Sequence, residues 1–182
     1  VSAGDAVLTN PTAVEQQNTT VTSSGFGMTS TSWAGQTFTP SVSGKIAQVD
    51  LDLFCSGCTG TTPNLTVSIR ATSGATPVPT GADLASATLA GFNSGGGGDY
   101  SVTFSSPLSV TAGTRYAIVV RATSNPSTGT YAYVCSCAGT GTVNSNPYAN
   151  GQRVTSANSG STWTADTTVG GRDLGFKVYM NN

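Results

Sequence analysis

The stretch KIAQVDLDLF at residues 45–54 sets the architecture of the chain. Within it, Val49, Leu51 and Leu53 alternate with two aspartates. Successive side chains of a β-strand point to opposite faces, so this period of two predicts a strand with one buried and one polar face.

The same alternation recurs on both sides of this stretch, and no window shows apolar residues at helical spacing. Further strands are predicted at residues 16–22, 35–39, 64–71, 84–89, 99–105, 115–122, 129–135, 152–155 and 173–180. The segment 115–122 is almost continuously apolar, which is typical of a central strand. Turn residues separate the strands, as at Pro77–Gly81, and the run Gly95–Gly98 is interpreted as a hairpin tip. About ten strands predict a single all-β domain over residues 1–182, a two-sheet antiparallel β-sandwich or jelly roll.

Composition excludes several classes of function. Charged residues make up 8% of the 182 residues, against about 25% in an average soluble domain. The net charge is −1 and no basic cluster exists, so nucleic acid is not an expected partner. No apolar run approaches the roughly 20 residues of a membrane span, so no membrane insertion is expected. Polar β-rich chains with little Lys and Glu are typical of secreted bacterial modules, and the start at Val1 suggests a piece of a longer, fused protein.

Four cysteines occur as two close pairs, Cys55 with Cys58 and Cys135 with Cys137. An even number of cysteines in such a chain predicts two disulfides and an oxidising, extracellular compartment. Both local pairing and cross-pairing between the two loops are compatible with the spacing. A zinc site with four thiolates is the alternative, although Cys-x-Cys is a poor zinc spacing.

Catalytic patterns are few. The chain has no histidine, which removes the usual general base and the commonest metal ligand. Asp50 and Asp52 would lie about 7 Å apart on one strand face, within the range of an inverting glycosidase. We interpret them as solvated surface aspartates, because environment rather than spacing makes a carboxyl group an acid. The chain is therefore predicted to be non-catalytic and to require no cofactor.

Aromatic residues in loops indicate sugar binding, since rings stack on the apolar faces of sugars while amides bind their hydroxyls. Trp33 and Trp163 lie in Ser/Thr-rich segments, and Tyr148 lies between Asn146 and Asn150. The alternatives are a plug at the end of the sandwich for Trp33 and a simple turn around Tyr148.

Arg153, Arg172 and Lys177 make the last third of the chain relatively basic. An anionic polysaccharide could use them as partners for its carboxylates. Scattered solubilising charge is the alternative interpretation.

Structural calcium is a further hypothesis. Calcium prefers carboxylate and carbonyl oxygens, and Asp5, Asp166 and Asp173 lie near the two ends of the chain.

Five phrases resemble a known class of bacterial extracellular module: AGQTFTP at 34–40, NLTVSIR at 64–70, TAGTRYAIV at 111–119, NPYANG at 146–151 and DLGFKVY at 173–179. This class consists of jelly-roll domains appended to secreted or surface proteins, including carbohydrate-binding modules of xanthan-degrading enzymes. The resemblance implies a module that tethers an enzyme to a polysaccharide. Because such modules also occur as spacers in adhesins, a structural or adhesion domain is the alternative.

Overall fold

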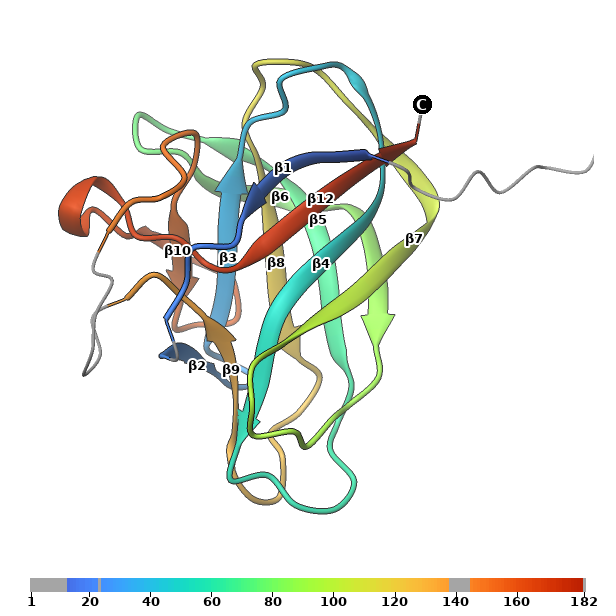
Figure 1. The fold of residues 1–182 in the computed structure, drawn as a ribbon, viewed down its shortest axis with the longest axis vertical. Coiled ribbons are helices and arrows are strands. Elements are labelled where there is room, and N and C mark those ends of the chain that lie inside the picture. Colours follow the sequence, from blue (N-terminus) through green and yellow to red (C-terminus); the bar gives the residue numbers. More distant parts are fainter. Residues whose placement is uncertain (1–12, 23, 138–144, 182) are drawn as a thin grey trace, which may run out of the picture.

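The computed structural model describes residues 13–22, 24–137 and 145–181. These residues form twelve strands and one short 3-10 turn, η1 (Thr168–Gly170). The strands build two antiparallel sheets that pack face to face, which confirms the predicted all-β sandwich (Figure 1). Over the same residues, no helix has the length and apolar character needed to cross a membrane.

Sheet A is organised around the long strand β4. It has the order β1-β12-β4-β9-β2, and β7 pairs with the other edge of β4. Its strands are β1 (Ala13–Asn18), β2 (Gly25–Met28), β4 (Gly44–Ser56), β7 (Gly98–Val110), β9 (Thr130–Val134) and β12 (Phe176–Asn181). In Figure 1, β4 and β12 cross in front of the second sheet.

Sheet B has the order β11-β10-β3-β8-β5-β6. Its strands are β3 (Trp33–Phe38), β5 (Leu65–Ser73), β6 (Val78–Leu89), β8 (Tyr116–Ala122), β10 (Arg153–Ser156) and β11 (Thr164–Ala165). The apolar segment predicted to be a central strand is β8, which lies between β3 and β5.

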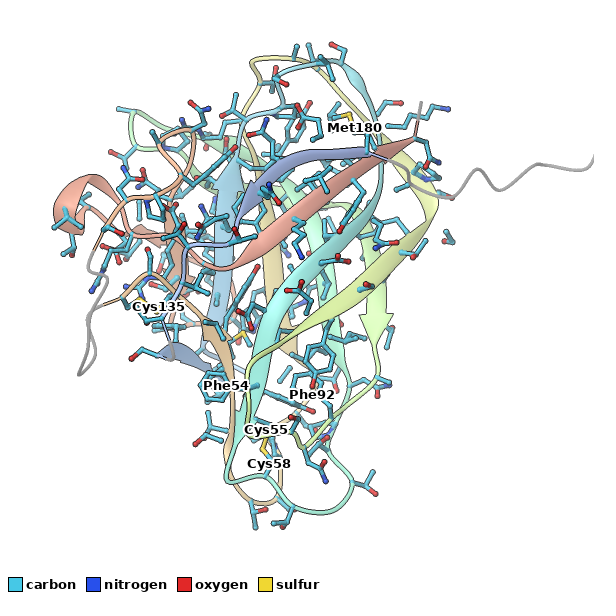
Figure 2. The ribbon with its side chains drawn as sticks, in the orientation of Figure 1. Phe54, Cys55, Cys58, Phe92, Cys135 and Met180 are labelled. Carbon is cyan, nitrogen blue, oxygen red and sulfur yellow. A yellow bond between two sulfur atoms is a disulfide. The ribbon has the colours of Figure 1, made fainter. Side chains whose placement is uncertain are left out.

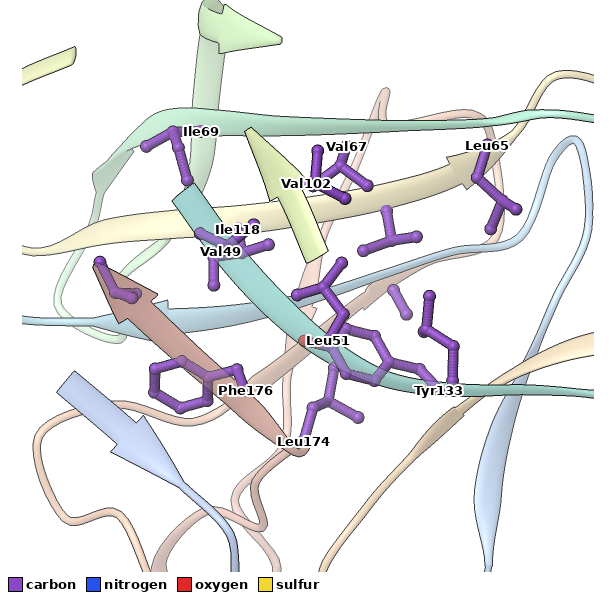
Figure 3. Close-up of a cluster of buried hydrophobic side chains, with 14 of the residues drawn as sticks. Val49, Leu51, Leu65, Val67, Ile69, Val102, Ile118, Tyr133, Leu174 and Phe176 are labelled. Carbon is purple, nitrogen blue, oxygen red and sulfur yellow. The ribbon is translucent and has the colours of Figure 1, made fainter. Parts of the chain in front are cut away.

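The core lies between the two sheets and contains the apolar positions that the alternation predicts. Val49 and Leu51 of β4 face Val67 and Ile118 of sheet B in the close-up of Figure 3. All four side chains are fully buried. Burial of such side chains contributes roughly 1.5–3 kcal/mol each to folding.

The structure differs from the predicted strands at three places. β2 and β11 were not predicted. β2 has two glycines among its four residues, and β11 has only two residues. The prediction of a turn at Pro77–Gly81 was wrong, because Val78 to Thr80 pair with β5. Pro79 is tolerated there because β6 is the edge strand of sheet B. One side of an edge strand pairs with no other strand, so a residue without an N–H can be placed there without losing a hydrogen bond between strands.

The run Gly95–Gly98 is not a hairpin tip. It ends the connection between β6 of sheet B and β7 of sheet A, and Gly98 is already the first residue of β7. The connection is tied to β4 where the backbone N–H of Cys55 donates to Ser94 O at 2.7 Å.

Both disulfides form within their own loops. Cys55 pairs with Cys58 and Cys135 pairs with Cys137, which leaves no free cysteine in the described chain (Figure 2). The prediction of two disulfides is confirmed, and local pairing is the connectivity that occurs. Each bridge fixes the local conformation at one end of a sheet A strand, β4 or β9.

Candidate functional site

The two tryptophans meet on sheet B. Trp33 begins β3 and Trp163 directly precedes β11, and β10 lies between these strands. Their ring centroids are 6.4 Å apart with the ring planes at 58°. Ala34, the next residue after Trp33, is in the core, so Trp33 projects from the outer face of the sheet. Both rings are half-buried.

Two arginines cover the ring of Trp33. The guanidinium carbon of Arg121 lies 5.0 Å from the ring centroid, and that of Arg70 lies 5.7 Å away. Both guanidinium groups form ion pairs with Asp83, and Arg70 Nε donates to Asp83 Oδ1 at 2.7 Å. Burial alone would raise the pKa of Asp83, but the hydrogen bonds from Arg121 and Arg70 outweigh it and lower the pKa. Trp33, Arg70, Arg121 and Asp83 therefore form a stack, in which a charged and hydrogen-bonded group extends the aromatic pair.

Asp83 reaches the stack through a bulge. Ile69 of β5 pairs with Ala85, whereas Ala71 pairs with Thr80, so four residues of β6 lie opposite one residue of β5. Gly81 takes the positive φ of +67° that this bulge requires. The sequence prediction missed Asp83, and Gly81 within a strand-forming segment is the signal that could have located it.

Arg153 and Arg172 meet at a shared carboxylate. Arg153 forms an ion pair with Asp166, and Arg172 Nε donates to Asp166 Oδ2 at 2.9 Å. Burial lowers the pKa of Arg153, against the attraction of Asp166. The cluster holds two cations and one anion, so it keeps a net positive charge in a partly buried setting.

An open hollow of about 250 Å³ lies beside this cluster. Its wall consists of the two arginines and Asp166 together with threonines from β10, β11 and η1. Thr164, in β11, follows Trp163 directly, so the aromatic pair and the cationic hollow flank the same edge strand. Four of the eight predicted ligand residues are thus brought to one edge of sheet B.

Tyr148 lies elsewhere, in the interior. Its side chain is only 7% exposed, and its ring packs edge-on against Phe176 with centroids 5.1 Å apart. Its hydroxyl donates to Gln16 Oε1 and accepts from the N–H of Thr39. Burial raises the pKa of this hydroxyl to about 12. The ring is a core element, and its faces are not available for stacking on a sugar.

The two asparagines beside Tyr148 differ. Asn146 Nδ2 donates to Gly170 O at 2.9 Å, which ties the segment to η1. Asn150 is exposed, and its backbone oxygen accepts from the hydroxyl of Thr39. Asn146 therefore supports the wall near the cationic hollow, whereas Asn150 lies beside β3.

The carboxylates considered for calcium have protein partners. Asp166 binds the two arginines, and Asp173 is fully buried, accepting hydrogen bonds from Gln36 and from the N–H of Tyr148. Asp5 lies outside the described residues. In the described part of the chain, no three Asp, Glu, His or Cys residues group together as metal ligands.

Lys177 lies on the outer face of sheet A, away from Arg153 and Arg172, and forms an ion pair with Asp99. The interpretation of Asp50 as a solvated aspartate was wrong, because Asp50 is only 7% exposed. Its two oxygens accept from Tyr179 at 2.6 Å and from Gln48 at 2.8 Å. Burial would raise the pKa of Asp50, but these hydrogen bonds outweigh it and lower the pKa.

No protein-family model, curated protein or solved structure matches this chain, so its function must be inferred from its own residues.

Proposed function

We propose that this chain is a non-catalytic, secreted module that binds an anionic polysaccharide at the edge strand β11 of sheet B. The observation that supports this is that Arg153 and Arg172 line one hollow beside β11, while Trp33 and Trp163 meet next to the start of the same strand. Aromatic rings offer stacking faces to sugars, and guanidinium groups bind carboxylates in a bidentate manner. Two buried disulfides are consistent with an oxidising compartment.

The charge balance favours an anion over a neutral sugar at this hollow. Arg153 and Arg172 share the single carboxylate of Asp166, so a polymer carboxylate would complete the neutralisation. Threonine hydroxyl groups on the wall can donate to the same carboxylate or bind sugar hydroxyls.

Affinity electrophoresis in native gels that contain xanthan, a polymer with carboxylate groups, tests the proposal. The unmodified protein should be retarded, and Arg172→Ala should lose at least tenfold in affinity. Lys45→Ala is the matched control, because it removes one exposed positive charge from sheet A. Titration calorimetry at 1 M NaCl should show weaker binding than at low salt, since a contact between charges near the surface is screened.

The alternative function is a structural spacer or adhesion domain without a sugar site. It is favoured by the poor access to two of the aromatic rings. Guanidinium groups cover Trp33, and Tyr148 is in the core. No retardation by any anionic polymer would favour this alternative. Equal retardation of Arg172→Ala and Lys45→Ala would instead mean that the polymer binds outside the arginine hollow.

A further inference from the structure

A second surface, on the outer face of sheet A, has the features of a separate ligand site. Two open hollows of about 240 and 270 Å³ adjoin each other there, and Asp52 of β4 is in the wall of both. Together they are comparable with small ligand pockets of roughly 300–1,000 Å³. This face points away from sheet B, where the arginine hollow lies.

Asp52 has hydrogen-bonding capacity to spare. Its Oδ1 is buried, and no described residue donates a hydrogen bond to it. An unpaired buried acceptor costs about 1–3 kcal/mol, so a donor from a ligand would be favourable. Burial and the neighbouring charge of Asp99 raise the pKa of Asp52, against a backbone hydrogen bond from Gly98 and the attraction of Lys177.

Glycines keep the space around Asp52 open. A Cβ atom on Gly97 would lie 3.0 Å from Asp52 Oδ1, and a Cβ on Gly175 would lie 2.9 Å from the Cβ of Asp52. Any larger residue at these two positions would fill the approach to the carboxylate. The glycine-rich end of the β6–β7 connection thus forms one wall of the first hollow.

An apolar ring faces the same hollow. Phe54, two residues after Asp52 on the same face of β4, is part of its wall and is labelled in Figure 2. One side of the ring rests on Gly25, where an added Cβ would meet Phe54 Cε1 at 2.5 Å. The ring is half-buried and held in place by this contact and by its neighbour Ala132 of β9.

The polar groups of the second hollow are of mixed sign. Asp99 lies directly opposite Asp52 in the β4–β7 pair, and Lys177 of β12 forms an ion pair with Asp99. Asn18, at the end of β1, is also in the wall. Hydroxyl groups match this mixture, because each can donate to a carboxylate and accept from an ammonium or amide group. A metal cation would use the carboxylates but neither Lys177 nor Phe54.

We propose that the hollows around Asp52 bind a neutral sugar ring, with Asp52, Asp99 and Lys177 bonded to its hydroxyl groups and Phe54 against its apolar face. This inference rests on the proposed function in that it gives the module a second sugar site of different chemistry. Two sites on opposite sheets would allow one module to contact two polysaccharide chains, or two parts of one chain, and gain avidity.

Affinity electrophoresis against four neutral polymers, namely hydroxyethyl cellulose, glucomannan, mixed-linkage β-glucan and dextran, tests this site. At least one polymer should retard the unmodified protein, and both Asp52→Ala and Phe54→Ala should weaken that retention at least tenfold. Gly97→Leu, which fills the hollow without removing a polar group, should do the same. Near-ultraviolet circular dichroism checks that each variant is folded.

Arg172→Ala separates the two proposals, because it should lose xanthan and keep the neutral polymer, whereas Asp52→Ala should do the reverse. Xanthan binding without any neutral binding would overturn the second site and leave the proposed function intact. Neutral binding that survives both Asp52→Ala and Phe54→Ala, or that requires added Ca²⁺, would overturn it as well. Release of reducing ends from the bound polymer would also overturn it, since the hollow would then be a catalytic centre.

Discussion

Gln36 and Asp173 are 137 residues apart in sequence, yet Gln36 Nε2 donates to Asp173 Oδ1 at 2.8 Å in the interior. Gln36 Oε1 in turn accepts from the N–H of Leu174 at 2.8 Å. The pair joins β3 of sheet B to the segment that leads into β12 of sheet A. Both side chains are fully buried, so this connection between the two sheets depends on the carboxyl group of Asp173, which has no contact with solvent.

This carboxyl group predicts an unusual dependence of stability on pH. Burial raises the pKa of Asp173 from 3.8 to about 6, despite hydrogen bonds from Tyr148 and Gln36. At a pH between 3.8 and about 6, Asp173 is mostly protonated in the folded protein and mostly ionised in the unfolded chain. The free energy of unfolding should therefore increase by about 1 kcal/mol as the pH falls from 7 to 5.

Urea denaturation at pH 5, 6 and 7 measures this change. Below about pH 4 the trend should reverse, because the carboxylates whose pKa is lowered, Asp50, Asp83 and Asp166, become protonated and lose their partners. In Asp173→Asn most of the gain between pH 7 and 5 should disappear, because Asp52 is the other described carboxylate with a raised pKa. A stability that is flat over this range in the unmodified protein would contradict the burial of an ionisable Asp173.

Asp83→Asn tests the stack on the outer face of sheet B. The substitution leaves two partly buried guanidinium groups, those of Arg70 and Arg121, without their carboxylate. We expect a loss of about 1–3 kcal/mol in the free energy of unfolding, measured with guanidinium chloride. Asp99→Asn is the control, since Asp99 is 51% exposed and an exposed ion pair contributes under about 1 kcal/mol. Equal losses in the two variants would mean that the stack adds nothing beyond a surface ion pair.

The disulfide connectivity can be read from tryptic peptides. Lys45 and Arg70 bracket the first cysteine pair, and Arg121 and Arg153 bracket the second, with no Lys or Arg inside either interval. Non-reducing digestion should give two separate peptides, each two hydrogens lighter than its reduced form by mass spectrometry. A single cross-linked species that joins both peptides would contradict local pairing.

The same bridges should contribute modestly to stability. They close loops across sequence separations of only 3 and 2 residues, for which loop entropy predicts about 2 kcal/mol each. Replacing either pair by alanines should lower the free energy of unfolding by about that amount and leave the protein folded. Unfolding of either variant in the absence of denaturant would show that the bridges do more than restrict the unfolded chain.

The sequence predicts the fold well where one face of a strand is buried and the other is solvated. Val49 and Leu51 of β4 alternate with polar residues, and both are in the core as expected. Pro79 gave the wrong indication because sequence alone does not show that β6 is an edge strand, where proline is tolerated.

The candidate site was less predictable, because it depends on pairing between distant strands. Trp33 and Trp163 come together only through the order β11-β10-β3, which no local pattern contains. Tyr148 and Asn146 look like a loop pair in the sequence, but the hydroxyl of Tyr148 reaches Gln16 of β1. The sequence does not show that Asp50 is buried, because Tyr179, which bonds to it, lies 129 residues away.

Gly151 tests the packing that positions the arginine cluster. It lies against β3, where an added Cβ would be 1.8 Å from the backbone oxygen of Thr37. The N–H and the hydroxyl of Thr37 both donate to Gln152 O, and the hydroxyl accepts from the N–H of Gln152. The segment therefore cannot shift outward without breaking these hydrogen bonds. Gly151→Ala should therefore lower the free energy of unfolding by about 2–4 kcal/mol.

Gly98→Ala is the matched control, since a Cβ there meets nothing within 4 Å, and it should change stability by no more than about 0.5 kcal/mol. Thermal denaturation of both variants gives the comparison. Because Gly151 is two residues from Arg153, its substitution should also displace the guanidinium group and weaken xanthan retention. A Gly151→Ala variant as stable as Gly98→Ala would show that β10 does not lie against β3 in the register described, and the arrangement of Arg153, Arg172 and Asp166 would fall with it.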